Sequence, residues 1–149
     1  MLKYLSAIFA VVAIVSGGCG RHPTWKYDGR FHDAIAGADR IVVIDDGFDC
    51  YGRNSGAKTL LEVSKPDEVR QFAENLEFQK GQILSTCPCN GYPRVDWFQG
   101  KRRLATVSIQ HCQTIRWRGF GADAKLTSKS SQWLRQWLTD RGVDVEKKK

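Results

Sequence analysis

The sequence has no apolar run long enough to form a series of membrane-spanning helices. Its longest apolar segment, residues 5–15, includes a serine, whereas a spanning helix needs about 20 apolar residues. There is no internal repeat and no glycine at every third position, and low complexity is confined to a short lysine tail at 147–149. These absences exclude a multi-span membrane protein and a collagen-like fibre.

Several catalytic motifs are also missing. The chain has no phosphate-binding glycine loop, no dinucleotide-binding glycine pattern and no serine elbow. Of its 3 histidines, only His111 has a potential nucleophile beside it, Cys112. Nucleophile and base usually meet through the fold rather than by adjacency, so this dipeptide is weak evidence for catalysis. We therefore expect a non-enzymatic role first.

The composition is that of one globular domain. Hydrophobic residues make up 42% of the 149 residues and charged residues 26%, which is enough apolar material for a single core and excludes a disordered chain. We expect this domain to cover residues 30–144, followed by a basic tail at 145–149.

The N-terminal residues resemble the signal and lipobox of bacterial lipoproteins. Lys3 precedes the apolar segment 5–15, and the small residues 16–18 lead directly to Cys19. The resemblance implies cleavage after residues 1–18, acylation of Cys19 and a lipidated tether at 19–29. Gly20, which is not acidic, implies sorting to the outer membrane, facing the periplasm. An ordinary secretory signal or an uncleaved anchor is the alternative.

Hydrophobic periodicity predicts an α+β two-layer sandwich, a mostly antiparallel sheet with helices on one face. We expect residues 31–38 to form a short helix. A β-branched run at 40–46 and a second apolar run at 58–63 follow it. Ser64 and Pro66 begin a helix, and Thr127 or Ser128 begins the last one, which ends at Gly142. The expected strands are 40–46, 58–63, 94–99, 102–109 and 113–118.

Residues 38–143 resemble a family of small uncharacterised bacterial proteins. The resemblance implies a compact α/β domain, no established activity and no role for any single residue. The matching segments are ADRIVV, LLEVSKPDEV, CPCNGY, LATVSIQH, IRW, GADAKLT and WLTDRGV.

With Cys19 lipidated, four cysteines remain in the domain. In an oxidising compartment an even number of cysteines indicates disulfides. A bridge between Cys87 and Cys89 would close a strained ring, so the expected bridges join Cys50 to one of these two residues and Cys112 to the other.

A zinc site is the second interpretation of these cysteines. Cys87, Cys89, Cys112 and His111 offer zinc-type ligands, with Cys50 as another. The spacing of Cys87 and Cys89 is shorter than zinc sites use, and His111 and Cys112 can converge only in a turn. A redox pair and free thiols also stay open.

Positive charge is concentrated in the second half of the domain. Residues 94–137 contain nine basic and two acidic side chains. We expect a contact with an anionic envelope polymer, a lipid surface or an acidic protein, and no nucleic acid; a solvated face is the alternative. The candidate contact residues are Lys101, Arg102, Arg103, Arg116 and Arg118.

The sequence is consistent with three functions. The first is a binding or structural lipoprotein held on the membrane by its lipid anchor. The second is a zinc-binding or enzymatic lipoprotein that uses Cys87, Cys89, His111 and Cys112. The third is an immunity protein that neutralises incoming toxins.

Overall fold

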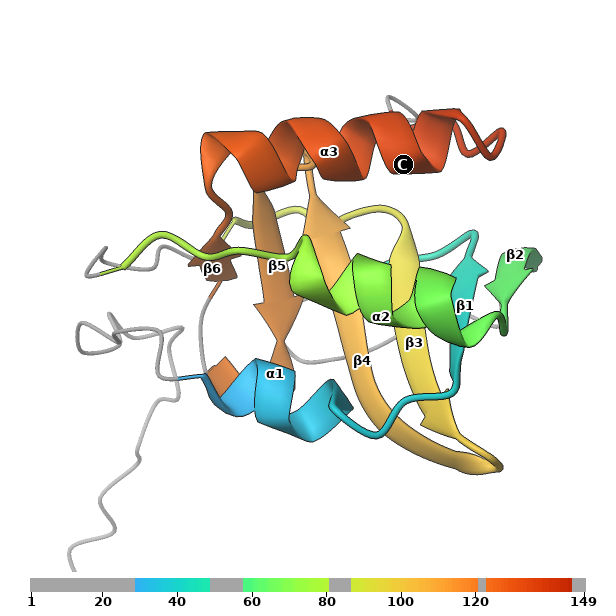
Figure 1. The fold of residues 1–149 in the computed structure, drawn as a ribbon. Coiled ribbons are helices and arrows are strands. Elements are labelled where there is room, and N and C mark those ends of the chain that lie inside the picture. The colour runs from blue at the N-terminus through green and yellow to red at the C-terminus, as the bar shows by residue number, and fades with distance from the viewer. Residues whose placement is uncertain (1–28, 49–57, 81–86, 121–122, 146–149) are drawn as a thin grey trace, which may run out of the picture.

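The computed structural model describes residues 29–48, 58–80, 87–120 and 123–145. The predicted signal segment, Cys19, Cys50 and the lysine tail lie outside them. Over the described residues, no helix has both the length and the apolar character needed to cross a membrane. The elements in chain order are α1 (Arg30–Ile35), β1 (Arg40–Ile44), β2 (Thr59–Val63), α2 (Pro66–Glu74), β3 (Arg94–Gln99), β4 (Arg102–Gln110), β5 (Thr114–Trp117), the 3-10 helix η1 (Arg118–Phe120), β6 (Asp123–Lys125) and α3 (Ser128–Thr139) (Figure 1).

The strands form one antiparallel sheet in the order β2-β1-β3-β4-β5-β6. The predicted α+β sandwich is therefore confirmed. Five of the strands lie where the sequence places them. The sixth, β6, was not predicted, because three residues are too few to show an alternating pattern and its backbone is ordered by pairing with β5.

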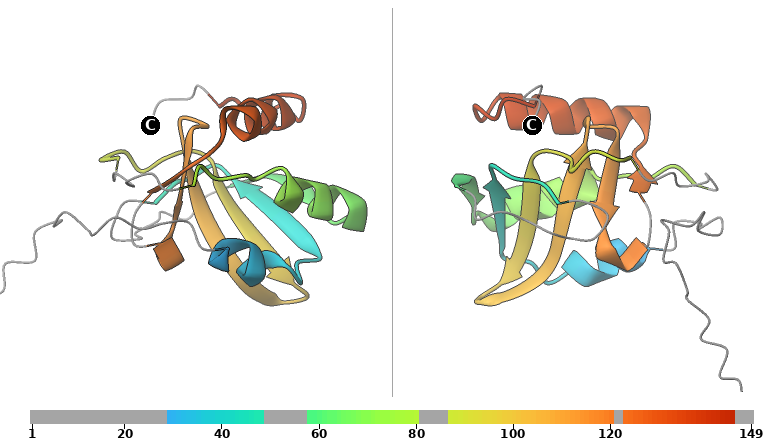
Figure 2. Two further views of the ribbon diagram at one scale, coloured as in Figure 1. Left: turned by 60° about the vertical axis from the view of Figure 1, so that its left-hand side comes forward. Right: turned by 180° about the vertical axis from the view of Figure 1, so that it is seen from behind.

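Three helices cover one face of this sheet and share its core (Figures 1 and 2). Trp97 of β3 lies near the centre and is fully buried. The ring of Phe31 from α1 contacts it edge-on at 5.5 Å, and that of Phe72 from α2 at 5.6 Å. Leu134 and Leu138 of α3 are also fully buried in this core.

The helix ends follow their local chemistry. The Thr127 side chain accepts a hydrogen bond from the Ser130 N–H and so caps α3, as predicted. Gly142 takes a φ of 74°, and the Val143 N–H donates to the Leu138 carbonyl just beyond α3. The start of α2 was partly mispredicted, because its N-cap is Lys65 and makes no side-chain capping bond.

The other face of the sheet buries polar side chains instead. Strand residues that alternate with the apolar core positions point to this side, where loops cover them. The Ser108 hydroxyl donates to the Asn90 carbonyl, and the Arg116 guanidinium donates to the Phe48 carbonyl. The buried polar residues of these strands are Arg94, Asp96, Ser108, Gln110, Arg116 and Asp123.

Candidate metal centre

The β4–β5 connection is a tight turn with an unusual backbone. His111 and Cys112 have φ values of 52° and 53°, and the Gln113 N–H donates to the Gln110 carbonyl. Two-residue hairpin turns of this kind normally use asparagine or glycine. Other residues in the left-handed region cost about 1–3 kcal/mol each and cluster at functional sites. The turn therefore holds these two side chains at an energetic cost.

This turn sends its two side chains into different environments. Cys112 is 1% exposed and belongs to the hydrophobic core, and its carbonyl accepts a hydrogen bond from Ser131 of α3. His111 is exposed and lies beside the loop that carries Cys87 and Cys89. The turn needed for convergence does exist, but it separates Cys112 from the other candidate ligands.

Cys87, Cys89 and His111 form a compact group. The His111 Nε2 lies 3.9 Å from the Cys87 Sγ and 3.7 Å from the Cys89 Sγ, and the three atoms all lie within 4.8 Å of one another. A sulfur and a nitrogen bound to one zinc ion lie about 3.5–3.8 Å apart, given bonds of about 2.3 and 2.0 Å. The group could therefore hold a metal ion after only small movements of its side chains.

A buried ion pair fixes the loop that carries the cysteines. The Arg116 Nε donates to Asp123 Oδ1 at 2.8 Å, and its Nη2 donates to Asp123 Oδ2 at 3.0 Å. The same guanidinium also donates to the carbonyls of Cys87 and Cys89. The Cys87 N–H in turn donates to Asp123 at 2.8 Å. Burial opposes the charge of Arg116, but its hydrogen bonds to Asp123, the charge of that carboxylate and the nearby Cys89 and Cys87 together raise the pKa of the guanidinium.

Arg116 is therefore not available for the anionic surface contact that the sequence suggested. Its side chain is only 6% exposed, because β5 turns it toward the loop-covered face of the sheet. Arg103 is half exposed and lies 3.5 Å from the buried carboxylate of Asp96. Lys101, Arg102 and Arg118 are exposed.

Gln110 lies directly beside the cysteines. The Cys89 thiol donates to the Gln110 Oε1 at 2.8 Å, while the Gln110 Nε2 has no partner among the described residues although the side chain is 1% exposed. Burial raises the pKa of the Cys89 thiol, and its hydrogen bond with Cys87 adds to this. A metal-bound thiolate has no proton to donate, and a half-turn of the amide would direct Nε2 toward the sulfur.

The structure also bears on the other roles predicted for the cysteines. No disulfide joins Cys87, Cys89 and Cys112 to one another among the described residues. Cys50, the other cysteine of the expected pairs, lies outside them, so a bridge to Cys50 stays a prediction. No helix begins at Cys87 or Cys89 in the described part of the chain, so these residues lack the helix N-terminus of thioredoxin-like redox pairs.

Sequence reasoning did not identify the residues that support the site. Arg116, Asp123 and Gln110 were not recognised as its supports, although strand alternation places Gln110 and Arg116 on the face opposite the core. It also did not predict the pair between Arg94 and Asp46, whose atoms lie 3.1 Å apart on the same face. A polar residue at alternate strand positions was the available clue.

Comparison with known proteins adds no relative. No protein-family model, no curated protein and no solved structure matches this chain. The lipobox and family resemblances therefore stay predictions.

Proposed function

We propose that this protein is a lipid-anchored envelope protein that binds zinc through Cys87, Cys89 and His111. The observation that carries the proposal is the convergence of two thiols and one imidazole within 4.8 Å. They come from two segments more than 20 residues apart in sequence, one a loop and the other a hairpin turn. The half-buried cysteines and the exposed histidine leave the group accessible to an incoming ion.

The donor set favours zinc over hard cations. Thiolate and imidazole ligands suit zinc and copper, whereas calcium and magnesium require oxygen ligands. Two thiolates also neutralise the charge of a divalent ion. The Gln110 Nε2, which has no partner among the described residues, would supply a donor for the Cys89 sulfur once the metal has displaced the thiol proton.

Three protein ligands leave one position of a tetrahedral zinc ion open. In metal sites of this type a water molecule or a fourth side chain completes the coordination. The sequence offers Cys50 as the fourth ligand. Cys112 does not serve, because it is buried in the core on the helix-covered side.

A competitive zinc titration of the purified full chain tests the metal site. We expect one equivalent of zinc to bind, and His111→Gln or the double change Cys87→Ser and Cys89→Ser to abolish tight binding. Even a supporting residue costs about 10–100-fold in metal affinity, so a lost ligand should cost more. Cys50→Ser shows whether a fourth cysteine takes part.

Cys112→Ser is the matched control for this titration, because it removes a thiol that lies outside the group. Zinc affinity should stay unchanged in this variant. An equal loss in the control, or no binding by the parent chain, would contradict the proposed site.

The lipid anchor is a separate part of the proposal, supported by the resemblance of residues 1–19 to a lipobox. Each acyl CH₂ buried in a bilayer contributes about 0.8 kcal/mol, so two or more chains anchor a protein stably. Cys19→Ser should abolish acylation and leave an unprocessed precursor. A variant of mature size that is still acylated in the membrane fraction would disprove this anchor.

A further inference from the structure

The β3–β4 hairpin and α1 lie at one end of the molecule, and α3 lies at the other (Figures 1 and 2). Gly29, the first described residue, comes immediately before α1. Cys19, the lipidated residue of the proposed anchor, is ten residues earlier in the sequence. Ten residues span at most about 36 Å when fully extended, so an anchor at Cys19 would keep the α1 and hairpin end of the domain close to the bilayer.

The tip of this hairpin carries positive charge. Residues 99–103 contain Lys101, Arg102 and Arg103 and no acidic residue. Within the described part of the chain, Lys101 and Arg102 make no ion pair, and Arg102 donates to a neutral glutamine oxygen of the same hairpin. Arg103 is half exposed and lies 3.5 Å from Asp96, a buried carboxylate that also pairs with a second arginine. The hairpin therefore offers exposed cations to an anionic surface.

Hydrogen bonds fix the hairpin to the segment that follows α1. The Asp39 N–H donates to the Phe98 carbonyl at 2.9 Å, and the Gly100 N–H donates to the Asp39 carboxylate at 2.7 Å. The Arg40 guanidinium donates to the Gly100 carbonyl at 3.3 Å and lies over the Phe98 ring. These contacts hold the hairpin in a fixed position relative to α1, and the Asp39 carboxylate beside the tip is already bound to the backbone.

The candidate metal centre lies at the opposite end of the same strand. Strand β4 runs for nine residues from Arg102 at the hairpin to Gln110, which precedes His111. At about 3.3 Å per residue, β4 places His111 up to about 30 Å from the tip. The turn that carries His111 contacts α3, since Ser131 donates to the Cys112 carbonyl. A surface that binds the hairpin therefore leaves the metal ligands accessible on the far side.

We infer that the hairpin end of the domain rests on an anionic lipid bilayer through its exposed cations, and that the metal centre faces away from the membrane. The inference rests on the proposed lipid anchor and adds to it a partner, the lipid headgroup, and an orientation. Lipid is favoured over a polymer or an acidic protein because the anchor brings this end to the bilayer. Each lysine or arginine near an anionic lipid surface contributes about fivefold in affinity.

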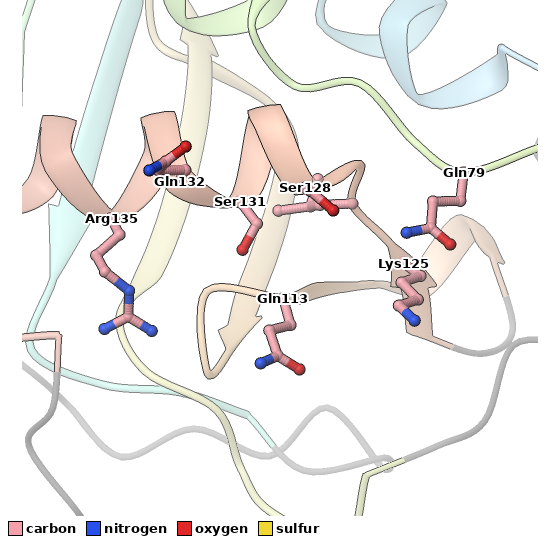
Figure 3. Close-up of a pocket in the computed structure, with 8 residues that line it drawn as sticks. Gln79, Gln113, Lys125, Ser128, Ser131, Gln132 and Arg135 are labelled. Carbon is pink, nitrogen blue, oxygen red and sulfur yellow. The ribbon is translucent and has the colours of Figure 1, made fainter.

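Partition of the full chain carrying Cys19→Ser between vesicles and buffer tests the contact in the absence of acyl chains. The N-terminal segment is the same in every variant, so differences between variants report the hairpin. The preference for phosphatidylglycerol vesicles over phosphatidylcholine vesicles should fall about 25-fold in Lys101→Gln with Arg102→Gln, and high salt should weaken it. The matched control, Lys125→Gln with Lys129→Gln, removes two exposed cations near the start of α3 (Figure 3) and should keep the preference.

Paramagnetic lipids test the orientation. In bicelles that contain phosphatidylglycerol and a gadolinium chelate on the headgroup, the amide signals of Gly100 and Lys101 should broaden more than those of His111 and Ser131. Lys101→Arg with Arg102→Lys keeps both charges and should behave like the parent chain, which separates loss of charge from a change in the hairpin.

Three results would overturn the inference: no anionic preference in the parent chain, an equal loss of preference in the control at Lys125 and Lys129, or broadening that is equal at both ends or strongest at α3. Because none of these measurements requires acylation, their outcome is distinct from that of the anchor. Mass spectrometry of the parent chain tests acylation of Cys19 separately, and an unacylated chain with a bilayer-bound hairpin would disprove the anchor alone.

Discussion

The two faces of the sheet bury side chains of opposite character. Under the helices, Phe31 and Phe72 pack by shape against the Trp97 ring and need no hydrogen-bonding partner. Under the loops, Arg116 and Asp123 are equally inaccessible, and each requires hydrogen-bonding groups from the other and from the covering loop.

This difference gives the two faces different roles, one in the stability of the fold and one in the positioning of side chains. Apolar burial stabilises the fold and tolerates many sequences, whereas a buried ion pair gives little net stability but is strongly destabilising when one partner is lost. The buried pair on the loop-covered face fixes the carbonyls of Cys87 and Cys89. We therefore assign the helix-covered face to stability and the loop-covered face to the placement of the metal ligands.

The largest expected effect is on the helix-covered face. Phe72→Ala should lower the free energy of unfolding by about 3–5 kcal/mol, because it leaves a cavity beneath three aromatic rings. Denaturant unfolding measures this loss, and Leu60→Ala at an exposed position is the control. A loss under about 1 kcal/mol would show that α2, which carries Phe72, does not cover the core.

On the loop-covered face, Arg116→Met should cost about 3 kcal/mol or more, because it leaves the Asp123 carboxylate buried and unpaired. Adding Asp123→Asn should recover part of the stability by removing that charge. Zinc affinity should stay low in both variants, since the loop has lost its anchor. Full recovery of zinc affinity in the double variant would show that Arg116 does not position the ligands.

Cysteine substitutions should separate the two faces directly. Cys112→Ala removes a core thiol and should cost about 1 kcal/mol of stability with unchanged zinc affinity. Cys89→Ala should abolish tight zinc binding with little change in stability of the metal-free protein. Unfolding and zinc titrations of both variants measure these effects. The reverse pattern would contradict the assignment of the two faces.

The smallest effect is expected at the β3–β4 hairpin. Lys101→Gln with Arg102→Gln should change stability by less than about 0.5 kcal/mol, since both side chains are exposed. If these cations contact an anionic surface, the variant should co-sediment less with anionic vesicles than the parent chain. High salt should also weaken the binding of the parent chain, because exposed charges are screened over about 8 Å at physiological salt. Vesicle binding that ignores salt would count against such a contact.

Sequence periodicity was sufficient for most of the fold. The apolar positions of α3, its Thr127 cap and the closing Gly142 follow from local rules, and the structure confirms them. The site was less accessible to such reasoning. The positive φ values at His111 and Cys112 depend on how the hairpin closes, and no local pattern shows that they send one side chain to each face.

The burial of Arg116 was missed for a related reason. Arginine is usually exposed, and its partner Asp123 lies on a strand of three residues that exists only through pairing with β5. A basic residue between two apolar strand neighbours could have suggested a partner on the opposite face.

X-ray absorption spectroscopy of the zinc-loaded full chain carrying Cys50→Ser tests the central claim most directly. Two sulfur ligands at about 2.3 Å and one histidine nitrogen at about 2.0–2.1 Å are expected, with an oxygen from water completing the shell. Cys112→Ala should leave this spectrum unchanged. A shell of oxygen and nitrogen alone, or loss of a sulfur ligand in the Cys112 variant, would contradict a centre formed by Cys87, Cys89 and His111.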